Sequence, residues 1–116
     1  MQLNNIVFPA PPCSYSTEKL FKDLIYIPKP GTDKAIPCLY LPYEQDSKLV
    51  LFFHGNAEDI GIAYEILCEI RACMKLSILA MEYPGYGLYH AEPDSETLLH
   101  DALFVYDHLN LIMHID

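Results

Sequence analysis

The stretch that decides the fold is "LVLFFHGNAEDIG", from Leu49 to Gly61. Its first five residues, Leu49 to Phe53, are all apolar, whereas a strand that faces water on one side alternates apolar and polar residues. Such a run predicts a strand covered on both faces, as in the parallel sheets of α/β proteins. The run stops at His54-Gly55-Asn56-Ala57 and passes directly into a helical pattern. The N–H groups from Asn56 to Asp59 are then among the unpaired donors of a helix N-terminus, so this strand end is a candidate site.

The residues that follow complete a strand–helix–strand unit. Between Asp59 and Lys75, apolar residues recur at a 3-4-3 spacing with charged residues between them, which predicts an amphipathic helix. Its apolar positions are Ala63, Leu67, Ile70 and Met74. The stretch "LSILAMEY", 76–83, is again almost entirely apolar and predicts a second buried strand. A unit of this kind is right-handed and pairs its two strands in parallel.

A second helix and two earlier strands extend this unit. The helix is expected to begin near Asp94 or Ser95, either of which can cap it. Its buried face is expected to consist of Leu98, Ala102, Val105 and Leu109. Upstream, "LFKDLIYIP" predicts a strand ended by Pro28, and "AIPCLYLP" predicts another that Pro37 places toward an edge of the sheet. The predicted order β-β-β-α-β-α indicates an α/β fold.

Composition and charge limit the classes of function. The 116 residues are 52% hydrophobic and 20% charged, which suits one small globular domain. The formal net charge of −9 argues against nucleic acid and anionic membrane surfaces as partners. No apolar run approaches the ~18 residues of a transmembrane segment, and from the pattern of residues 1–16 we expect no secretory signal. The cysteines show no C-x-x-C spacing, so we expect reduced thiols, a cytoplasmic location and no metal or cofactor.

Two loops are expected to share the functional edge of the sheet. In parallel α/β sheets, ligands bind beyond the carboxyl ends of the strands. Those ends are His54 to Ala57 and Glu82 to Gly87. Backbone donors at a helix N-terminus stabilise a negative oxygen. Neither a P-loop nor a dinucleotide-binding glycine motif is present in the sequence, so an oxyanion hole is the function that this loop suits best.

Three segments at this separation resemble the first half of an α/β-hydrolase: "FFHGNAEDIG", "MEYPGYG" and "EPDSET". Within that fold the chain is similar to the α/β-hydrolase-domain-containing proteins that include protein depalmitoylases, close to the serine aminopeptidase-like group. The lead-in "FPAPPCSYS" is also similar to that branch. The resemblance implies an α/β-hydrolase N-terminal half with an incomplete central sheet. Residues 1–19 would form a Pro-rich extended leader, and residues 20–116 a partial domain that ends before the nucleophile elbow.

The resemblance also implies roles for individual residues. The first oxyanion donor would be the backbone N–H of Asn56, with Ala57 as the near alternative. Loop support would come from His54, Gly55, Glu82, Tyr83, Gly85, Tyr86 and Gly87. The chemistry of two of these residues leaves alternatives open. His54 is either a hydrogen-bonded structural group or a base, and Glu82 either braces the loop or replaces an Asp common in the family.

The catalytic residues that the resemblance implies are missing from this sequence. The nucleophile of the fold lies in G-x-S-x-G, with an acid and a His later in the chain, and no serine here lies between glycines. The final residues "LNLIMHID" stand about where the next strand and elbow would begin. An oxyanion donor without a nucleophile cannot run acyl transfer. We therefore assign no catalytic residue and expect these 116 residues alone to be inactive.

The remaining histidines have no Ser or Cys at a sequence spacing that would indicate a catalytic pair. We expect His90 to be solvated, and His100, His108 and His114 to be non-catalytic because no Ser or Cys stands at a suitable spacing. A metal site built from His54, Glu58 and Asp59 is not expected, since no second histidine cluster accompanies them.

Two classes of function stay open. The first is a serine hydrolase of acyl esters or thioesters, similar to palmitoyl-protein hydrolases, of which this chain is an N-terminal piece or a shortened product. The second is a non-catalytic binding remnant of the fold. Without a further neighbour, strand 49–53 would be an apolar edge through which the chain could self-associate. The resemblance leaves peripheral membrane association open.

Overall fold

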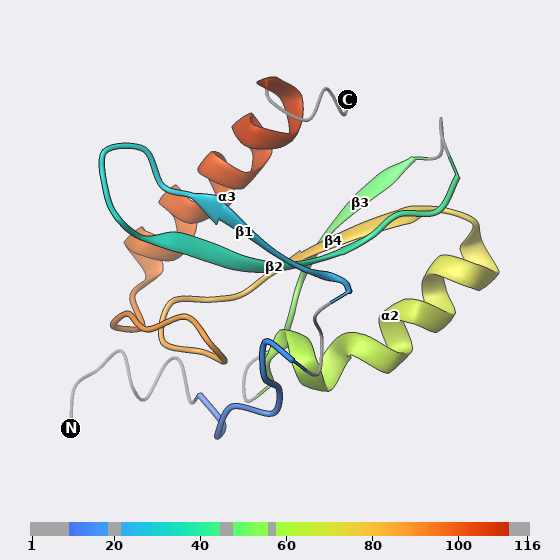
Figure 1. Cartoon of the computed structure of the whole chain (residues 1–116), viewed down its shortest axis with the longest axis horizontal. Helices are drawn as coiled ribbons and strands as arrows, with labels where there is room; N and C mark the ends of the chain where they lie inside the picture. The colour runs from blue at the N-terminus through green and yellow to red at the C-terminus, as the bar shows by residue number, and fades with distance from the viewer. Residues whose placement is uncertain (1–9, 19–21, 45–47, 56–57, 112–116) are drawn as a thin grey trace.

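The structure, a computed structural model, describes residues 10–18, 22–44, 48–55 and 58–111. Its elements are β1 (Leu24–Pro28), β2 (Ala35–Leu41), β3 (Leu49–Phe53), α2 (Ile60–Met74), β4 (Ser77–Met81) and α3 (Ser95–Leu111) (Figure 1). This is the predicted order β-β-β-α-β-α. The architecture is α/β, with a mixed sheet and two helices among the described residues, consistent with part of an α/β-hydrolase fold.

The described strands form one four-stranded sheet in the order β1-β2-β4-β3. β3 and β4 are parallel, from Leu49 opposite Ser77 to Phe53 opposite Met81, which confirms the predicted pairing of the two apolar strands. β1 and β2 form an antiparallel hairpin, and β2 is also antiparallel to β4. The carboxyl ends of β3 and β4 therefore meet at one edge of the sheet.

The expected edge position of β2 is wrong, because β2 lies between β1 and β4. Pro37 is tolerated there by its position in the ladder. The register of Cys38 with Met81 brings Pro37 opposite Glu82, the residue that follows β4. Glu82 N–H donates to the Pro37 carbonyl at 2.9 Å, and only the reciprocal bond, which a proline cannot make, is lost.

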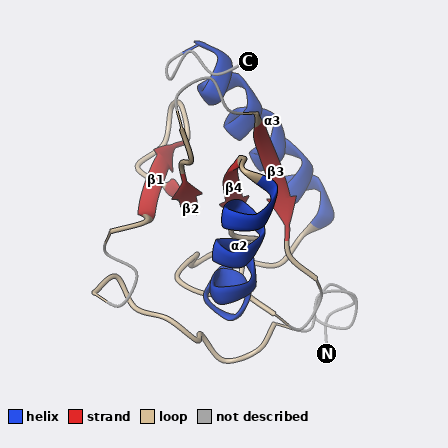
Figure 2. Cartoon of the chain, turned by 90° about the vertical axis from the view of Figure 1, so that its right-hand side faces the viewer, coloured by secondary structure: helices blue, strands red, loops and turns tan. Residues whose placement is uncertain are grey.

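The two faces of the sheet are covered by different helices. Strand residues alternate between the faces, so Leu79 and Met81 of β4 pack with Val105 and Leu109 of α3. On the opposite face, the cluster consists of Tyr15, Leu39, Leu41, Ile60, Ala63, Leu67, Ile78 and Ala80. Figure 2 shows α2 nearest the viewer and α3 farther away, with the strands between them. All five residues of β4 are buried, as its apolar sequence predicts.

β3 is less buried than its sequence predicts. Leu49 and Leu51 pack against the α3-side cluster and Phe52 against the α2-side cluster, so both faces are partly covered. Val50 and Phe53 nevertheless keep 42% and 49% of their surface exposed. The reason is that β3 has a strand neighbour on one side only within the described sheet.

The helix stripes agree with the sequence in part. α3 buries Val105 and Leu109 and partly buries Leu98 and Ala102, as expected. The carboxylate of Asp94 caps it by accepting from Thr97 N–H at 3.0 Å. In α2, Ala63 and Leu67 are buried, whereas Ile70 and Met74 are 37% and 65% exposed. The predicted stripe thus contacts the sheet only through its first half.

Candidate functional site

The site lies at the joint carboxyl end of β3 and β4. His54 is the residue after β3 and Glu82 the residue after β4. Because Phe53 and Met81 are in register, the parallel pairing brings these two polar residues side by side. His54 Nε2 lies 2.8 Å from Glu82 Oε1, and both side chains are buried. Two positions selected from separate loops of the sequence therefore form one buried pair.

Besides His54, three hydrogen-bond donors hold the Glu82 carboxylate: two backbone N–H groups and one tyrosine hydroxyl. Its Oε1 accepts from the N–H of Tyr83 at 3.2 Å. Its Oε2 accepts from the N–H of Ile60 at 3.3 Å and from the Tyr15 hydroxyl at 2.6 Å. Burying a carboxylate without partners costs several kcal/mol. These donors offset that cost, and they join the leader, both strand ends and the start of α2 at one side chain.

The imidazole of His54 is fully engaged. Its Nδ1 lies 2.9 Å from the Gly55 carbonyl and its Nε2 faces Glu82. Both ring nitrogens therefore face oxygen atoms of the protein. The ring stacks on Tyr83 at a centroid distance of 3.7 Å. No ring nitrogen is left to accept a proton from a substrate, so this geometry favours a structural role for His54 over a base.

Tyr83 and Tyr86 form the aromatic wall of the site. The Tyr83 hydroxyl donates to the His54 carbonyl at 2.5 Å, which ties the two loops together a second time. Burial, with the nearby Tyr86, Glu58 and Glu82 adding to it, raises the pKa of Tyr83 to about 12. Tyr86 is fully buried, and burial followed by the charge of Glu82 raises its pKa. Its hydroxyl finds no hydrogen-bond partner among the described residues.

The loop after β4 needs its glycines. Gly85 and Gly87 have φ of 84° and 51°, in the region that favours glycine. A Cβ on Gly87 would overlap the Glu82 carboxylate and the Tyr15 ring. Gly85 N–H donates to the Tyr89 carbonyl at 3.1 Å, which closes the turn. The turn therefore lies directly against the Glu82–His54 pair.

α2 begins at Ile60, directly after Asp59, where the pattern between Asp59 and Lys75 predicts a helix. Asp59 is the N-cap, and its side chain accepts from Ile62 N–H at 2.9 Å. The unpaired donors of the helix therefore begin at Asp59, and two of them, at Ile60 and Ile62, already have carboxylate partners. Gly55 N–H donates to Glu58 Oε1 at 2.7 Å. The predicted oxyanion donors, Asn56 and Ala57, lie outside the described residues.

Sequence reasoning missed the part of the leader that reaches this site. Tyr15 is buried, and Ser14 contacts Asp59 through both its backbone N–H, at 2.8 Å, and its hydroxyl. Two signals could have found them: an aromatic residue within the Pro-rich segment, and Gly61 inside a helical pattern. A glycine in a helix interior costs about 1 kcal/mol relative to alanine and so suggests a close neighbour.

A second buried polar cluster lies away from this site. Lys29 Nζ contacts Asp101 Oδ1 at 2.9 Å and the Tyr89 hydroxyl at 3.0 Å, and Tyr89 donates to Asp101 Oδ2 at 2.6 Å. Burial lowers the pKa of Lys29, but its bonds to Tyr89 and Asp101 outweigh that effect and leave the pKa raised. Burial and the bond to Asp101 raise the pKa of Tyr89 to about 12. This cluster joins the end of β1 to α3.

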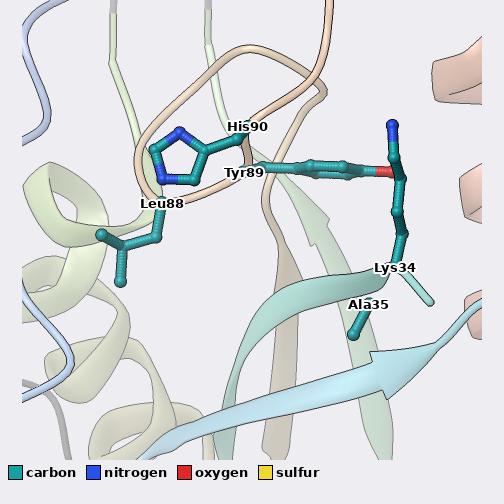
Figure 3. A pocket seen from close by; sticks show the side chains of 5 residues that line it. All are labelled: Lys34, Ala35, Leu88, Tyr89 and His90. Carbon is teal, nitrogen blue, oxygen red and sulfur yellow. The ribbon is translucent and has the colours of Figure 1, made fainter.

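Neither Glu82 nor His54 lines the hollow in Figure 3. It is open, has a volume of about 180 Å³, and is lined by Lys34, Ala35, Leu88, Tyr89 and His90. His90 and His100 are exposed, and His114 lies outside the described residues. No group of three or more His, Cys, Asp or Glu in the described segments could hold a metal ion. Neither described helix is long and apolar enough to cross a membrane.

Known proteins resemble this chain over part of their length. No protein-family model matches, and no solved structure gives a significant match. Proteins named Alpha/beta hydrolase domain-containing protein 17C, from Mus musculus, Bos taurus and Homo sapiens, are each 25% identical to it over 88 residues. That match covers 75% of this chain but only 27 to 28% of each relative. These similarities support a relationship to α/β-hydrolase-like proteins over part of the chain.

Proposed function

We propose that this chain supplies the N-terminal part of a serine hydrolase fold that acts on acyl esters or thioesters, in the manner of a palmitoyl-protein hydrolase. Its contribution would be the oxyanion loop after β3, with Asn56 as the first donor and Ala57 as the alternative. The observation that carries the proposal is the buried Glu82–His54 pair, which joins the two strand-end loops where α/β sheets bind ligands.

The bonds around this pair are those that a preorganised anion site requires. A donor that stabilises a developing negative oxygen is effective only when the folded chain already holds it in place. Residues on both sides of Asn56 and Ala57 are held: Gly55 by Glu58, and Ile60 by Glu82. Tyr83 fixes the His54 carbonyl from the opposite loop. The described residues that flank the predicted donors are thus held by contacts from both loops.

The 116 residues alone should not hydrolyse esters. Two of the described serines are held in structural contacts: Ser14 is bonded to Asp59, and the Ser77 hydroxyl accepts from Tyr43 N–H at 2.9 Å. Both ring nitrogens of His54 are occupied, so it cannot serve as the general base. The nucleophile, the acid and the base would come from sequence that corresponds to the part of the relatives outside their match with this chain.

Active-site labelling tests this proposal. Extract from cells that express the gene is treated with a fluorophosphonate probe, and an antibody to this sequence reports the mass of the reactive band. We expect a labelled band at about twice the 13.3 kDa of this chain or more, since α/β domains of about 200–250 residues fall there. The recombinant 116-residue chain, as the matched control, should stay unlabelled. A cellular protein that carries this sequence but is never labelled would contradict the proposal.

A second candidate function is a non-catalytic module that self-associates through β3. The observation in its favour is that β3 has one strand neighbour in the described sheet and exposes Val50 and Phe53. An unpaired apolar edge is a template for adding another strand. Sedimentation velocity over a concentration series should show dimers that Val50→Lys abolishes. Tyr26→Lys, on the exposed face of the other edge strand, β1, is the matched control and should leave them intact.

A further inference from the structure

The part of the leader formed by Ser14 and Tyr15, here called the leader latch, lies between the two loops of the site. It contacts residues that are 45 to 73 positions away in the sequence. Ser14 bonds to Asp59, the N-cap of α2, through both its backbone N–H and its hydroxyl. Tyr15 is buried and reaches the Glu82 carboxylate. The latch is therefore part of the site although it belongs to neither strand-end loop.

One hydroxyl group serves both loops. Tyr15 OH donates to Glu82 Oε2 at 2.6 Å and accepts from the backbone N–H of Leu88 at 3.2 Å. Since Leu88 N–H can only donate, the proton of the Tyr15 hydroxyl points to Glu82. Burial, together with the negative charge of Glu82, raises the pKa of Tyr15, so the hydroxyl keeps that proton. Glu82 Oε2 in turn accepts from Ile60 at the start of α2.

The slot that holds Tyr15 is built from glycines. A Cβ on Gly61 would come within 2.5 to 2.8 Å of the Ser14 hydroxyl and of Tyr15 side-chain atoms. A Cβ on Gly87 would overlap the Tyr15 ring and the Glu82 carboxylate from the other loop. Gly61 lies within α2, where alanine would otherwise be preferred. The absence of side chains at these two positions makes room for the latch.

We propose that Tyr15 is a positioning residue of the site and that the leader latch controls it: the docked hydroxyl orients Glu82, and through Glu82 it orders His54 and the loop that leads into α2. Withdrawal of the latch would leave Glu82 Oε2 short of a donor and Leu88 N–H without an acceptor, and would loosen the contacts of Gly55 and Ile60. The inference rests on the proposed function only for the statement that this loop holds an oxyanion. The latch itself requires no catalysis.

Amide hydrogen exchange of the 116-residue chain tests the latch. Tyr15→Phe keeps the ring in its slot and removes only the hydroxyl. We expect the amides of Gly55, Ile60 and Leu88 to exchange about tenfold faster, as for the loss of one buried hydrogen bond. The amide of Leu79 in β4 should change only with global stability. Tyr26→Phe, an exposed tyrosine on β1, is the matched control and should change none of them.

This experiment separates positioning from a merely structural contact. If only Leu88 accelerates, Tyr15 caps one loop and does not order the other, and the proposal is overturned. It is equally overturned if all four amides accelerate by the same factor, because that pattern reports global destabilisation alone.

A substitution at Gly61 provides an independent test through the sign of its effect. On helix propensity alone, Gly61→Ala should favour the folded state by about fivefold in the unfolding equilibrium constant. With the latch docked, the new Cβ meets Ser14 and Tyr15, and we expect the urea midpoint to fall instead. The exchange of Gly55 and Ile60 should accelerate as in Tyr15→Phe. In a Ser14→Gly/Tyr15→Gly background, which removes the side-chain atoms that the new Cβ would meet, Gly61→Ala should become stabilising. A rise of the midpoint in the otherwise unchanged chain would overturn the latch.

Neither latch experiment depends on hydrolysis. A protein that shows the exchange pattern but is never labelled by fluorophosphonate would refute the proposed function and leave the latch standing. A labelled protein in which Tyr15→Phe and Gly61→Ala lack these effects would refute the latch alone.

Discussion

Glu82 and Asp101 are both fully buried carboxylates, yet the fold satisfies them in different ways. Asp101 is paired with the ammonium of Lys29, which keeps 15% of its side chain exposed, and with one tyrosine. Glu82 has no lysine or arginine partner among the described residues and instead collects donors from the leader, both strand ends and α2. The Lys29 cluster pins one strand to one helix. The Glu82 cluster joins every segment that borders the candidate site.

The largest effect is expected from Glu82→Ala. It removes the acceptor for His54, Tyr15 and Ile60 at once and leaves those buried donors unpaired. Breaking a buried pair by removing one partner costs about 3–5 kcal/mol, so the free energy of unfolding should fall by about that amount. Urea denaturation followed by circular dichroism measures it. Glu65→Ala, at an exposed position of α2, is the control. Equal midpoints for the two variants would contradict the role assigned to Glu82.

Lys29→Met should have the next largest effect, about 2–3 kcal/mol, because the buried Asp101 then keeps only Tyr89 as a side-chain partner within the described part of the chain. The estimate lies below that for Glu82 because Lys29 is partly solvated. Lys34→Met, at an exposed position of the same hairpin, should change the urea midpoint little. The double variant Lys29→Met/Asp101→Asn should be less destabilised than the sum of the two single variants, since the pair is removed together. Additive effects would show that the two groups are not coupled.

Alkaline pH should weaken both clusters. The pKa values of Tyr83 and Tyr89 are raised to about 12 in the fold, whereas an unfolded tyrosine titrates near 10. Between these values the unfolded chain has lost the protons that the folded chain keeps. The stabilisation is therefore fully present below pH 10 and is lost as the pH rises through 12. Urea midpoints measured from pH 9 to 12 should fall, and less steeply in Tyr83→Phe or Tyr89→Phe. A slope unchanged by either substitution would contradict this account.

The smallest effect is expected from Tyr89→Phe. The ring stays in the core while the bonds to Asp101 and Lys29 are lost, which should cost about 1 kcal/mol because the Lys29–Asp101 pair persists. The variant sharpens the comparison with Tyr15→Phe, which should have a similar effect on global stability. Only the Tyr15 variant should alter amide exchange around Gly55 and Ile60. The same local change in both variants would show that the two clusters are not separate.

The parallel core of the fold could be predicted from local sequence. The apolar runs that became β3 and β4, the capping Asp94 and the Val105–Leu109 face of α3 all follow rules of spacing and capping, which act over a few residues. The position of β2 could not be predicted in this way. The rule that prolines avoid interior strands takes no account of register, and Pro37 faces the point where the ladder with β4 ends.

The site could be predicted only in part for a similar reason. His54 and Glu82 follow from where two parallel strands end, so the sequence brings them together. The contribution of Tyr15 depends on a contact across 67 residues and on room left by two glycines, and no local pattern encodes either. The exposure of Ile70 and Met74 could not be predicted from the spacing of apolar residues either, because it depends on how far the sheet extends along α2.

The glycine slot for Tyr15 has an evolutionary consequence. The ring of one residue occupies the volume that a side chain at either of two others would need, so the three positions cannot change independently. Among related sequences, a large aromatic at position 15 should occur together with glycine at 61 and 87. Related sequences with alanine or a larger residue at position 61 should carry a small residue at position 15. In those proteins the leader should no longer pack against the start of α2 and the loop after β4.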